Sequence, residues 1–213
     1  MRNVALLAGP LVDLSSAAAV LEATGLQVIS PGNVCREHVQ LRTPLGEQMN
    51  RYMQTGHLIP DVLTTKAIAD ALAAVDGGWL LCNYPRRIDQ AELLAQSGHA
   101  PDTVIELVLT KDELDLMARR RIERRIELDP QQAGRGDELL LMYSHYQENY
   151  QEQIEPLRAY YRTRGMLWTA SGSGGYEDMA ATLLPTAADG RGLPQTARAC
   201  LQRLTTIGVA RRW

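Results

Sequence analysis

The chain reads Gly78-Trp79-Leu80-Leu81-Cys82-Asn83-Tyr84-Pro85-Arg86 near its middle, where an apolar run stops at a polar turn. Short, nearly continuous apolar runs are typical of parallel strands that are buried on both faces of a sheet. Four further runs share this pattern: Val4 to Ala8, Leu26 to Ile29, Val104 to Leu109 and Met166 to Thr169. Together the five runs predict an α/β fold, a five-stranded parallel sheet with helices on both faces and every strand buried on both faces.

Helical patterns fill the gaps between these runs. The expected helices are Leu14 to Ala23, two short helices between Val34 and Met53 split at Pro44, Asp61 to Val75, Ile88 to Gln96, Lys111 to Leu128, and a long helix from about Asp137 to Arg164. The stretch Arg191 to Trp213 follows a linker and carries a stripe on one helical face: Ala197, Leu201, Leu204 and Gly208. It predicts an appended amphipathic helix.

Composition excludes several classes of protein. The 213 residues are 45% hydrophobic and 22% charged, as in globular proteins, and their net charge of -3 does not favour nucleic-acid binding. Charged residues recur too often for a membrane span. Cys35, Cys82 and Cys200 have no metal-ligand spacing, so we expect a cytoplasmic protein without a metal site.

The segments that follow the strands carry a resemblance to the adenylate kinases, the nucleoside-monophosphate kinases of the P-loop class. Residues 78–86 look like that family's GFxLDGFPR, and Gln90-Ala91 looks like the QA that follows it. Residues 29–36 are similar to ISTGDMLR, and residues 56–61 match GxLVPD. The resemblance implies a P-loop kinase-like domain over residues 1–184. It would contain a monophosphate-binding insertion at about 30–60 and a short lid at about 125–137, with 185–213 as linker and appended helix.

The resemblance also implies an acceptor site for a nucleoside monophosphate such as AMP. Its residues would be Pro31, Gly32, Arg36, Gly56, Ile59, Asn83, Arg86 and Gln90. Arg36 and Arg86 fall where the family grips the monophosphate, and guanidinium groups suit that task because they bind phosphate with two parallel hydrogen bonds. Gln90 falls where the family binds the adenine. The alternative is that both arginines are surface ion-pair partners.

The donor side departs from the family. A phosphate loop of the form GxxxxGK[ST] needs glycines for close backbone approach, a lysine for the phosphate oxygens and a hydroxyl for Mg²⁺. The corresponding residues here are Gly9, Pro10, Asp13, Leu14, Ser15 and Ser16. Leu14 stands at the lysine position, Asp13 replaces a glycine, and only Ser16 keeps its type. We therefore expect a strand-turn-helix connection with Asp13 as the helix N-cap, and Mg-ATP is not an expected ligand.

Other family features are missing or moved. Cys82 stands where the family has an acid that organises Mg²⁺, and Ser144 and Tyr146 stand where it has arginines. Lid candidates for a catalytic role are Arg124, Arg125, Arg135 and Asp137. The alternative for these arginines is a solvated helix terminus.

Three functional hypotheses follow. The leading one is a degenerate kinase that binds a nucleoside monophosphate and regulates or binds a protein partner, with its C-terminal helix as a partner or homodimer contact. The second is an enzyme repurposed for a nucleotide-like substrate. The third is a weak nucleoside-monophosphate kinase whose lid arginines replace the lysine.

Overall fold

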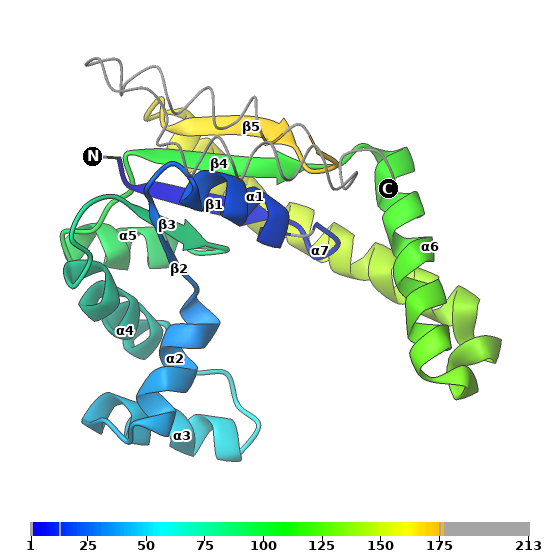
Figure 1. Ribbon diagram of the computed structural model, residues 1–213, viewed down its shortest axis with the longest axis horizontal. Coiled ribbons are helices and arrows are strands. Elements are labelled where there is room, and N and C mark those ends of the chain that lie inside the picture. The colour runs from blue at the N-terminus through cyan, green and yellow to red at the C-terminus, as the bar shows by residue number, and fades with distance from the viewer. Residues whose placement is uncertain (1, 13, 175, 177–213) are drawn as a thin grey trace.

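The computed structural model describes residues 2–12, 14–174 and 176, and it contains the predicted five-stranded parallel sheet. The strand order is β2-β3-β1-β4-β5 (Figure 1). The strands are β1 (Val4–Ala8), β2 (Gln27–Ile29), β3 (Trp79–Cys82), β4 (Thr103–Val108) and β5 (Leu167–Ser171). All strand pairs are parallel, so the carboxyl ends of the five strands lie at one edge of the sheet.

Helices cover both faces of the sheet, as predicted. The helices are α1 (Leu14–Glu22), α2 (Pro31–Gln40), α3 (Pro44–Gln54), α4 (Asp61–Ala73), α5 (Ile88–Gln96), α6 (Lys111–Leu128) and α7 (Gly136–Arg162), with a 3-10 helix η1 (Pro130–Arg135) between the last two. Alternate residues of β1 separate the two faces. Val4 and Leu6 pack with α1, whereas Ala5 and Leu7 pack with α5 and α7.

Burial of the strands follows their position in the sheet. The central strand β1 is buried along its whole length. The prediction that every strand is buried on both faces is wrong for β2 and β5, where Gln27 is exposed and Trp168 is 54% exposed. Both are edge strands that pair with one neighbour only, so the described residues cover them less completely than the centre.

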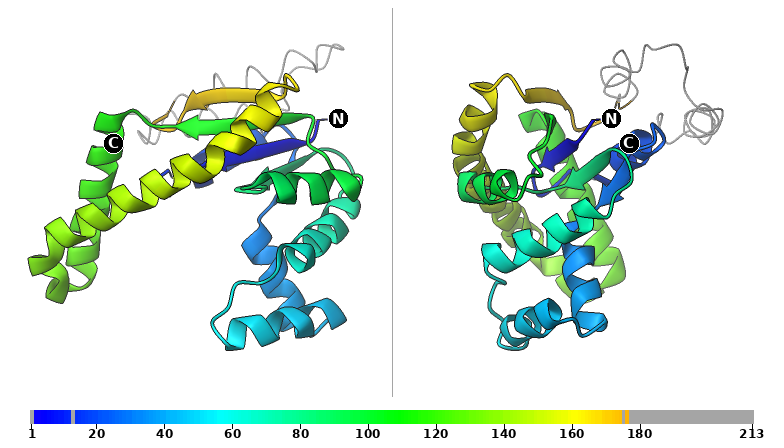
Figure 2. Two further views of the ribbon diagram at one scale, coloured as in Figure 1. Left: turned by 180° about the vertical axis from the view of Figure 1, so that it is seen from behind. Right: turned by 90° about the vertical axis from the view of Figure 1, so that its left-hand side faces the viewer.

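Two arms extend from the sheet: the α2–α3 arm (residues 31–54) and the α6–α7 arm, which comprises α6, η1 and the start of α7. The left view of Figure 2 shows the arms as separate projections. The predicted split at Pro44 is confirmed, although α2 begins at Pro31 rather than Val34 because proline suits a first helical turn. Within the α2–α3 arm a Cβ at Gly46 would lie 1.9 Å from the carbonyl oxygen of His38. The two helices therefore require glycine at their contact.

The α6–α7 arm begins with a capping box. The Thr110 hydroxyl accepts the Glu113 N–H, and the Glu113 carboxylate accepts the Thr110 N–H, which fixes the start of α6. Ala118 and Ile122 are the buried residues of α6. In the described part of the chain, no helix is long and apolar enough to cross a membrane. The predicted appended helix, Arg191 to Trp213, lies outside the described residues.

Candidate functional site

The connections that follow β2, β3 and β1 meet at one edge of the sheet. Ile29 of β2 is in register with Leu81 of β3, and Cys82 of β3 is in register with Leu6 of β1. Because these strands are parallel neighbours, the start of α2, the turn from Asn83 to Arg87 and the loop after Ala8 lie side by side. Ligands bind at such edges in open α/β sheets.

Asn83 joins two of these connections. Its backbone N–H donates to the Leu6 carbonyl oxygen at 2.7 Å, and its side-chain oxygen accepts the Ala8 N–H at 3.0 Å. Its φ of 55° lies in the left-handed region, which asparagine tolerates better than other non-glycine residues. The Asn83 side chain is thus engaged in a hydrogen bond within the protein, at Ala8, where the loop after β1 begins.

Arg36 and Arg86 are exposed and hold only neutral partners. Arg36 donates to the side-chain oxygen of Asn33 and lies over Gly32, where a Cβ would be 3.3 Å from its guanidinium nitrogen. The Nε of Arg86 donates to the Asn83 carbonyl oxygen at 3.2 Å. Neither arginine forms an ion pair with a described residue, so both positive charges remain available to an anion.

Gln90 is buried and fully oriented by its neighbours. Its side-chain oxygen accepts the Arg86 N–H at 2.8 Å, and its side-chain nitrogen donates to Asp61 at 2.7 Å. Asp61 also pairs with Arg87, which in turn holds Asp89. The hydrogen bond from Arg87 lowers the pKa of the Asp89 carboxyl. The turn after β3 is therefore cross-linked to the start of α4.

The link between α3 and α4 contains Gly56 and Ile59. Gly56 has a φ of 71°, which favours glycine, and it is exposed. Ile59 packs against the core beside the α2–α3 arm, while Leu58 between them is 94% exposed. Pro31, the last of the predicted acceptor residues, occupies the first position of α2.

The loop after β1 is short and packed onto the core. The Val12 N–H donates to the Gly9 carbonyl oxygen at 3.2 Å, which closes a turn with Pro10 at its exposed tip. Leu11 is 6% exposed, and Val12 and Leu14 pack against the cluster around β1 and α1. Leu14, at the position that resembles the phosphate-loop lysine, is thus partly buried against the apolar core. Asp13 lies outside the described residues.

Helix α7 packs against the other side of this loop. A Cβ at Gly9 would lie 3.0 Å from the side-chain oxygen of Gln147 and 3.4 Å from the ring of Tyr150. That Gln147 oxygen is buried, and no described residue donates a hydrogen bond to it. The cavity left between the loop and α7 measures about 10 Å³, room for one water molecule at most. The described side chains around Gly9 therefore leave no room for a phosphate group.

A buried ion pair holds α7 to the sheet beside this cavity. Arg158 donates to the two oxygens of Glu106 at 2.7 and 2.6 Å, and the Tyr150 hydroxyl donates to Glu106 at 3.4 Å. Glu106 is 2% exposed. The hydrogen bond to Glu106 raises the pKa of Arg158, and burial raises the pKa of Tyr150. Both groups keep their protons, which fixes the charges of the network.

Few of the described residues near the loop could hold a cation. Burial raises the pKa of the partly buried Cys82 thiol to about 11, so it stays neutral where the family has an acid. Ser15 and Ser16 lie in the first turn of α1, the former exposed and the latter half-buried. Among residues 2–12, 14–174 and 176, no group of three His, Cys, Asp or Glu side chains could hold a metal ion.

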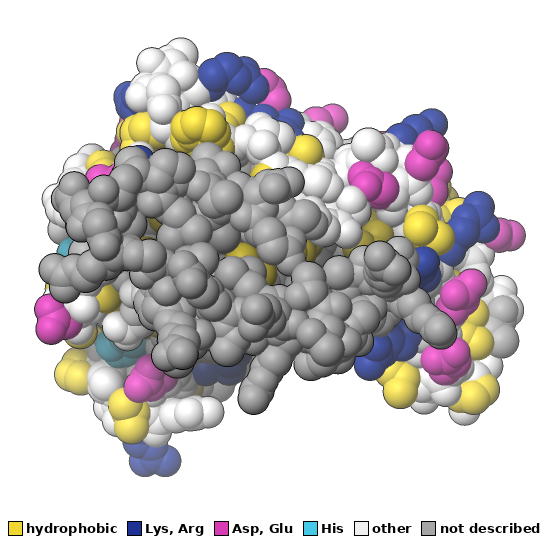
Figure 3. Space-filling model, turned by 45° about the horizontal axis from the view of Figure 1, so that its top comes forward, with side chains coloured by type: hydrophobic (Ala, Val, Ile, Leu, Met, Phe, Trp, Pro, Cys, Tyr) yellow, Lys and Arg dark blue, Asp and Glu magenta, His cyan; other side chains and the backbone are white. Residues whose placement is uncertain are grey.

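The lid candidates are exposed residues of the α6–α7 arm. Arg124 and Arg125 lie near the end of α6, and they form no ion pair within the described residues. Arg135 donates to both oxygens of Glu138, at 2.8 and 2.7 Å, and Asp137 lies in the first turn of α7. Arginine side chains gather beside acidic ones at this end of the molecule (Figure 3).

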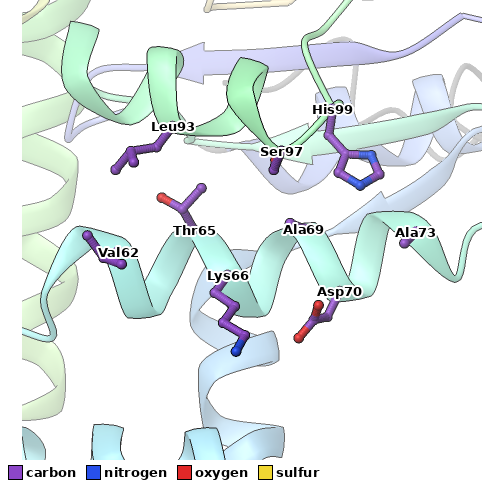
Figure 4. A pocket seen from close by; sticks show the side chains of 9 residues that line it. All are labelled: Val62, Thr65, Lys66, Ala69, Asp70, Ala73, Leu93, Ser97 and His99. Atoms are coloured by element: carbon purple, nitrogen blue, oxygen red, sulfur yellow. The ribbon is translucent and has the colours of Figure 1, made fainter.

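The sequence contains two lysines, and neither lies in the loop after β1. Lys111 begins α6, and Lys66 lies on α4. Lys66 borders a groove of about 390 Å³ between α4 and α5, with Asp70 and His99 (Figure 4). No described lysine therefore follows β1 at the sheet edge.

Sequence reasoning assigned no role to several residues that shape this site. They are Asn33, Asp61, Thr65, Arg87, Glu106, Gln147 and Arg158. Asp61 stood within a recognised motif, so a signal for it was present. Glu106 and Arg158 are 52 residues apart in the sequence, and no sequence motif indicates that they pair.

Comparisons with known proteins identify relatives of this chain. The adenylate kinase family profile matches residues 15–166. The chain is similar to an adenylate kinase of Micrococcus luteus, 31% identical over 80% of this chain and 82% of the relative. It is similar to one of Leifsonia xyli, 31% identical over 85% and 90%, and to one of Clavibacter michiganensis, 33% identical over 79% and 83%.

Proposed function

Because the chain belongs to the adenylate kinase family, we propose that it binds a nucleoside monophosphate such as AMP and has lost phosphoryl transfer from ATP. It would act through binding, as a sensor or as a regulator of a protein partner. The observation that carries the proposal is that Leu14, at the lysine position, is an apolar side chain packed against the core cluster of β1 and α1.

The acceptor half rests on Arg36 and Arg86. Both guanidinium groups are exposed, and neither is neutralised by a described carboxylate. A charge-assisted hydrogen bond contributes about 1.5 to 3 kcal/mol, so two arginines that share one phosphate are sufficient to anchor it. Gln90 and the link from Gly56 to Ile59 would contact the base and ribose.

The donor half lacks the groups that phosphoryl transfer needs. The reaction depends on positioning and charge stabilisation, and the protein contributes little other chemistry. Leu14 replaces the lysine, Cys82 replaces the acid, and the buried oxygen of Gln147 faces Gly9. If each absent group costs about 3 kcal/mol in the transition state, two of them lower the rate by roughly four orders of magnitude.

A weak nucleoside-monophosphate kinase is the second candidate. The observation in its favour is the arginine cluster of α6, whose members are Arg119, Arg120, Arg121, Arg124 and Arg125 and which forms no ion pair within the described part of the chain. These cations, with Arg135, would replace the lysine from the lid.

We also propose that the domain organisation of the chain follows that of the family. We take residues 1–184 as the nucleotide-binding domain, with the α2–α3 arm as its monophosphate insertion and η1 at the tip of its lid. Residues 185–213 would contact a partner or a second copy through the stripe that contains Leu201 and Leu204. A cytoplasmic location fits Cys35 and Cys82, which are free thiols.

Calorimetry with AMP and with Mg-ATP tests the function. The proposal expects AMP to bind the wild type more tightly than Mg-ATP, and Arg86→Ala to weaken AMP at least about tenfold with little change in melting temperature. An exposed arginine remote from the sheet edge, Arg162, supplies the control variant Arg162→Ala. Micromolar Mg-ATP binding without AMP binding would overturn the proposal that the monophosphate site is retained and the ATP site is lost.

A further inference from the structure

We infer that Asp61 and Thr65 are positioning residues, which hold the turn from Tyr84 to Gln90 so that Arg86 faces the monophosphate. The inference rests on the proposed function of that turn. Neither residue needs to touch the ligand, because each acts through a residue of the turn.

Asp61 holds the end of the turn. One carboxylate oxygen accepts the Gln90 side-chain N–H at 2.7 Å, and the other pairs with Arg87. The oxygen of the same Gln90 amide accepts the Arg86 N–H at 2.8 Å. A carboxylate can only accept and a backbone N–H can only donate, so these two partners fix the orientation of the amide. Asp61 is thus connected to the Arg86 backbone through one buried side chain.

Thr65 holds the beginning of the turn. It lies four residues after Asp61, on the same face of α4, and its hydroxyl bonds to the Tyr84 hydroxyl. Both side chains are 4% exposed. Burial raises the pKa of Tyr84 to about 12, so the phenol remains neutral and able to donate. One face of α4 therefore contacts both ends of the turn that carries Arg86.

These contacts connect the α2–α3 arm to the turn from Tyr84 to Gln90. Asp61 is the first residue of α4, where the chain returns from the α2–α3 arm that carries Arg36. Arg87 is neutralised by Asp61 and Asp89, which leaves Arg86 as the turn's cation without a described acidic partner. The contacts would thus select which of the two adjacent arginines meets the phosphate.

AMP titrations of Asp61 variants test this inference. Asp61→Ala should weaken AMP binding about tenfold, because Gln90 and the Arg86 backbone lose their anchor. Asp61→Asn should lose no more than about threefold, because an amide oxygen still accepts from Gln90. Asp112→Ala removes an acid from the first turn of α6, which follows β4 rather than β3, and should leave the affinity unchanged. The ³¹P chemical shift of bound AMP should move toward the free value in Asp61→Ala and not in Asp112→Ala.

A second pair of variants keeps the inference falsifiable if Asp61→Ala does not fold. Thr65→Val should weaken AMP binding several-fold, and Thr65→Ser, which keeps the hydroxyl, should restore it. If the wild type binds AMP and Arg86→Ala impairs it, but the Asp61 and Thr65 variants bind normally with an unchanged ³¹P shift, the inference fails and the proposed function stands. If the wild type does not bind AMP, the proposed function fails and the inference with it.

Discussion

The side-chain oxygen of Asn83 accepts the backbone N–H of Ala8 at 3.0 Å, so the turn that carries Arg86 is bonded to the start of the loop after β1. The acceptor and donor halves of the sheet edge are therefore not independent. Asn83 does this from a left-handed backbone conformation, with φ of 55°. Asparagine at this position therefore supplies the hydrogen-bond acceptor and also tolerates the left-handed backbone conformation.

Substitutions at Asn83 should separate these two contributions. Asn83→Ala loses the hydrogen bond and places a Cβ in the left-handed region, so the free energy of unfolding should fall by about 2 to 3 kcal/mol. Asn83→Gly loses the bond but tolerates the conformation, so it should cost only about 1 kcal/mol. Urea unfolding of both variants measures the difference. Equal losses would show that backbone conformation contributes nothing at this position.

The pair of Glu106 and Arg158 should stabilise α7 on the sheet. Arg158→Met leaves Glu106 buried without its cation, and it should lower the free energy of unfolding by about 3 kcal/mol. The double variant Glu106→Leu with Arg158→Met removes both charges and should lie within about 1 kcal/mol of the wild type. Arg162→Met, at an exposed ion pair, is the control and should change little. A double variant as unstable as the single one would contradict this account.

Stability should depend on the ionisation of Cys82 at alkaline pH. The pKa of its thiol is raised from 9.0 to about 11 in the folded protein, so the unfolded state ionises first. The stabilisation is therefore complete below pH 9 and is lost as the pH rises through about 11. Cys82→Ser should reduce the alkaline loss of unfolding free energy by about 1 to 2 kcal/mol, since partial exposure weakens the effect. Parallel curves for wild type and variant would contradict the prediction.

Restoring the lysine alone should not create a kinase. Leu14→Lys should leave AMP-dependent ADP formation within about tenfold of the wild type, because Leu14 packs on the core and Cys82 remains neutral. A coupled assay on this variant, beside one with a full glycine-lysine loop and Cys82→Asp, makes the comparison. A rise of more than about a thousandfold from the single change, roughly 4 kcal/mol, would mean that the donor site is nearly intact.

Much of the fold could be predicted from the sequence, because apolar runs and helical patterns report burial directly. Trp79–Cys82 is both the expected strand and the observed one. The limits appear where position in the sheet decides the outcome. Trp168 belongs to an apolar run as good as the others, yet it lies on an edge strand and is half exposed.

The candidate site was predictable where a residue stands in a sequence motif. The motifs point to Arg36, Arg86 and Gln90, which lie in connections that meet at one sheet edge; their role in binding stays a prediction. Contacts between distant segments were not predictable. Gln147 and Tyr150 approach Gly9 only because α7 packs across the sheet, and no local pattern in either segment indicates that approach.

The most direct test of the central claim is the rate of ADP formation from AMP and Mg-ATP by the wild-type protein, measured beside the adenylate kinase of Micrococcus luteus under the same conditions. An Arg86→Ala preparation made by the same route reports any contaminating kinase. Loss of the lysine and the acid predicts a turnover at least about four orders of magnitude below that relative. A turnover within about tenfold of it, abolished in Arg86→Ala, would contradict the loss of phosphoryl transfer.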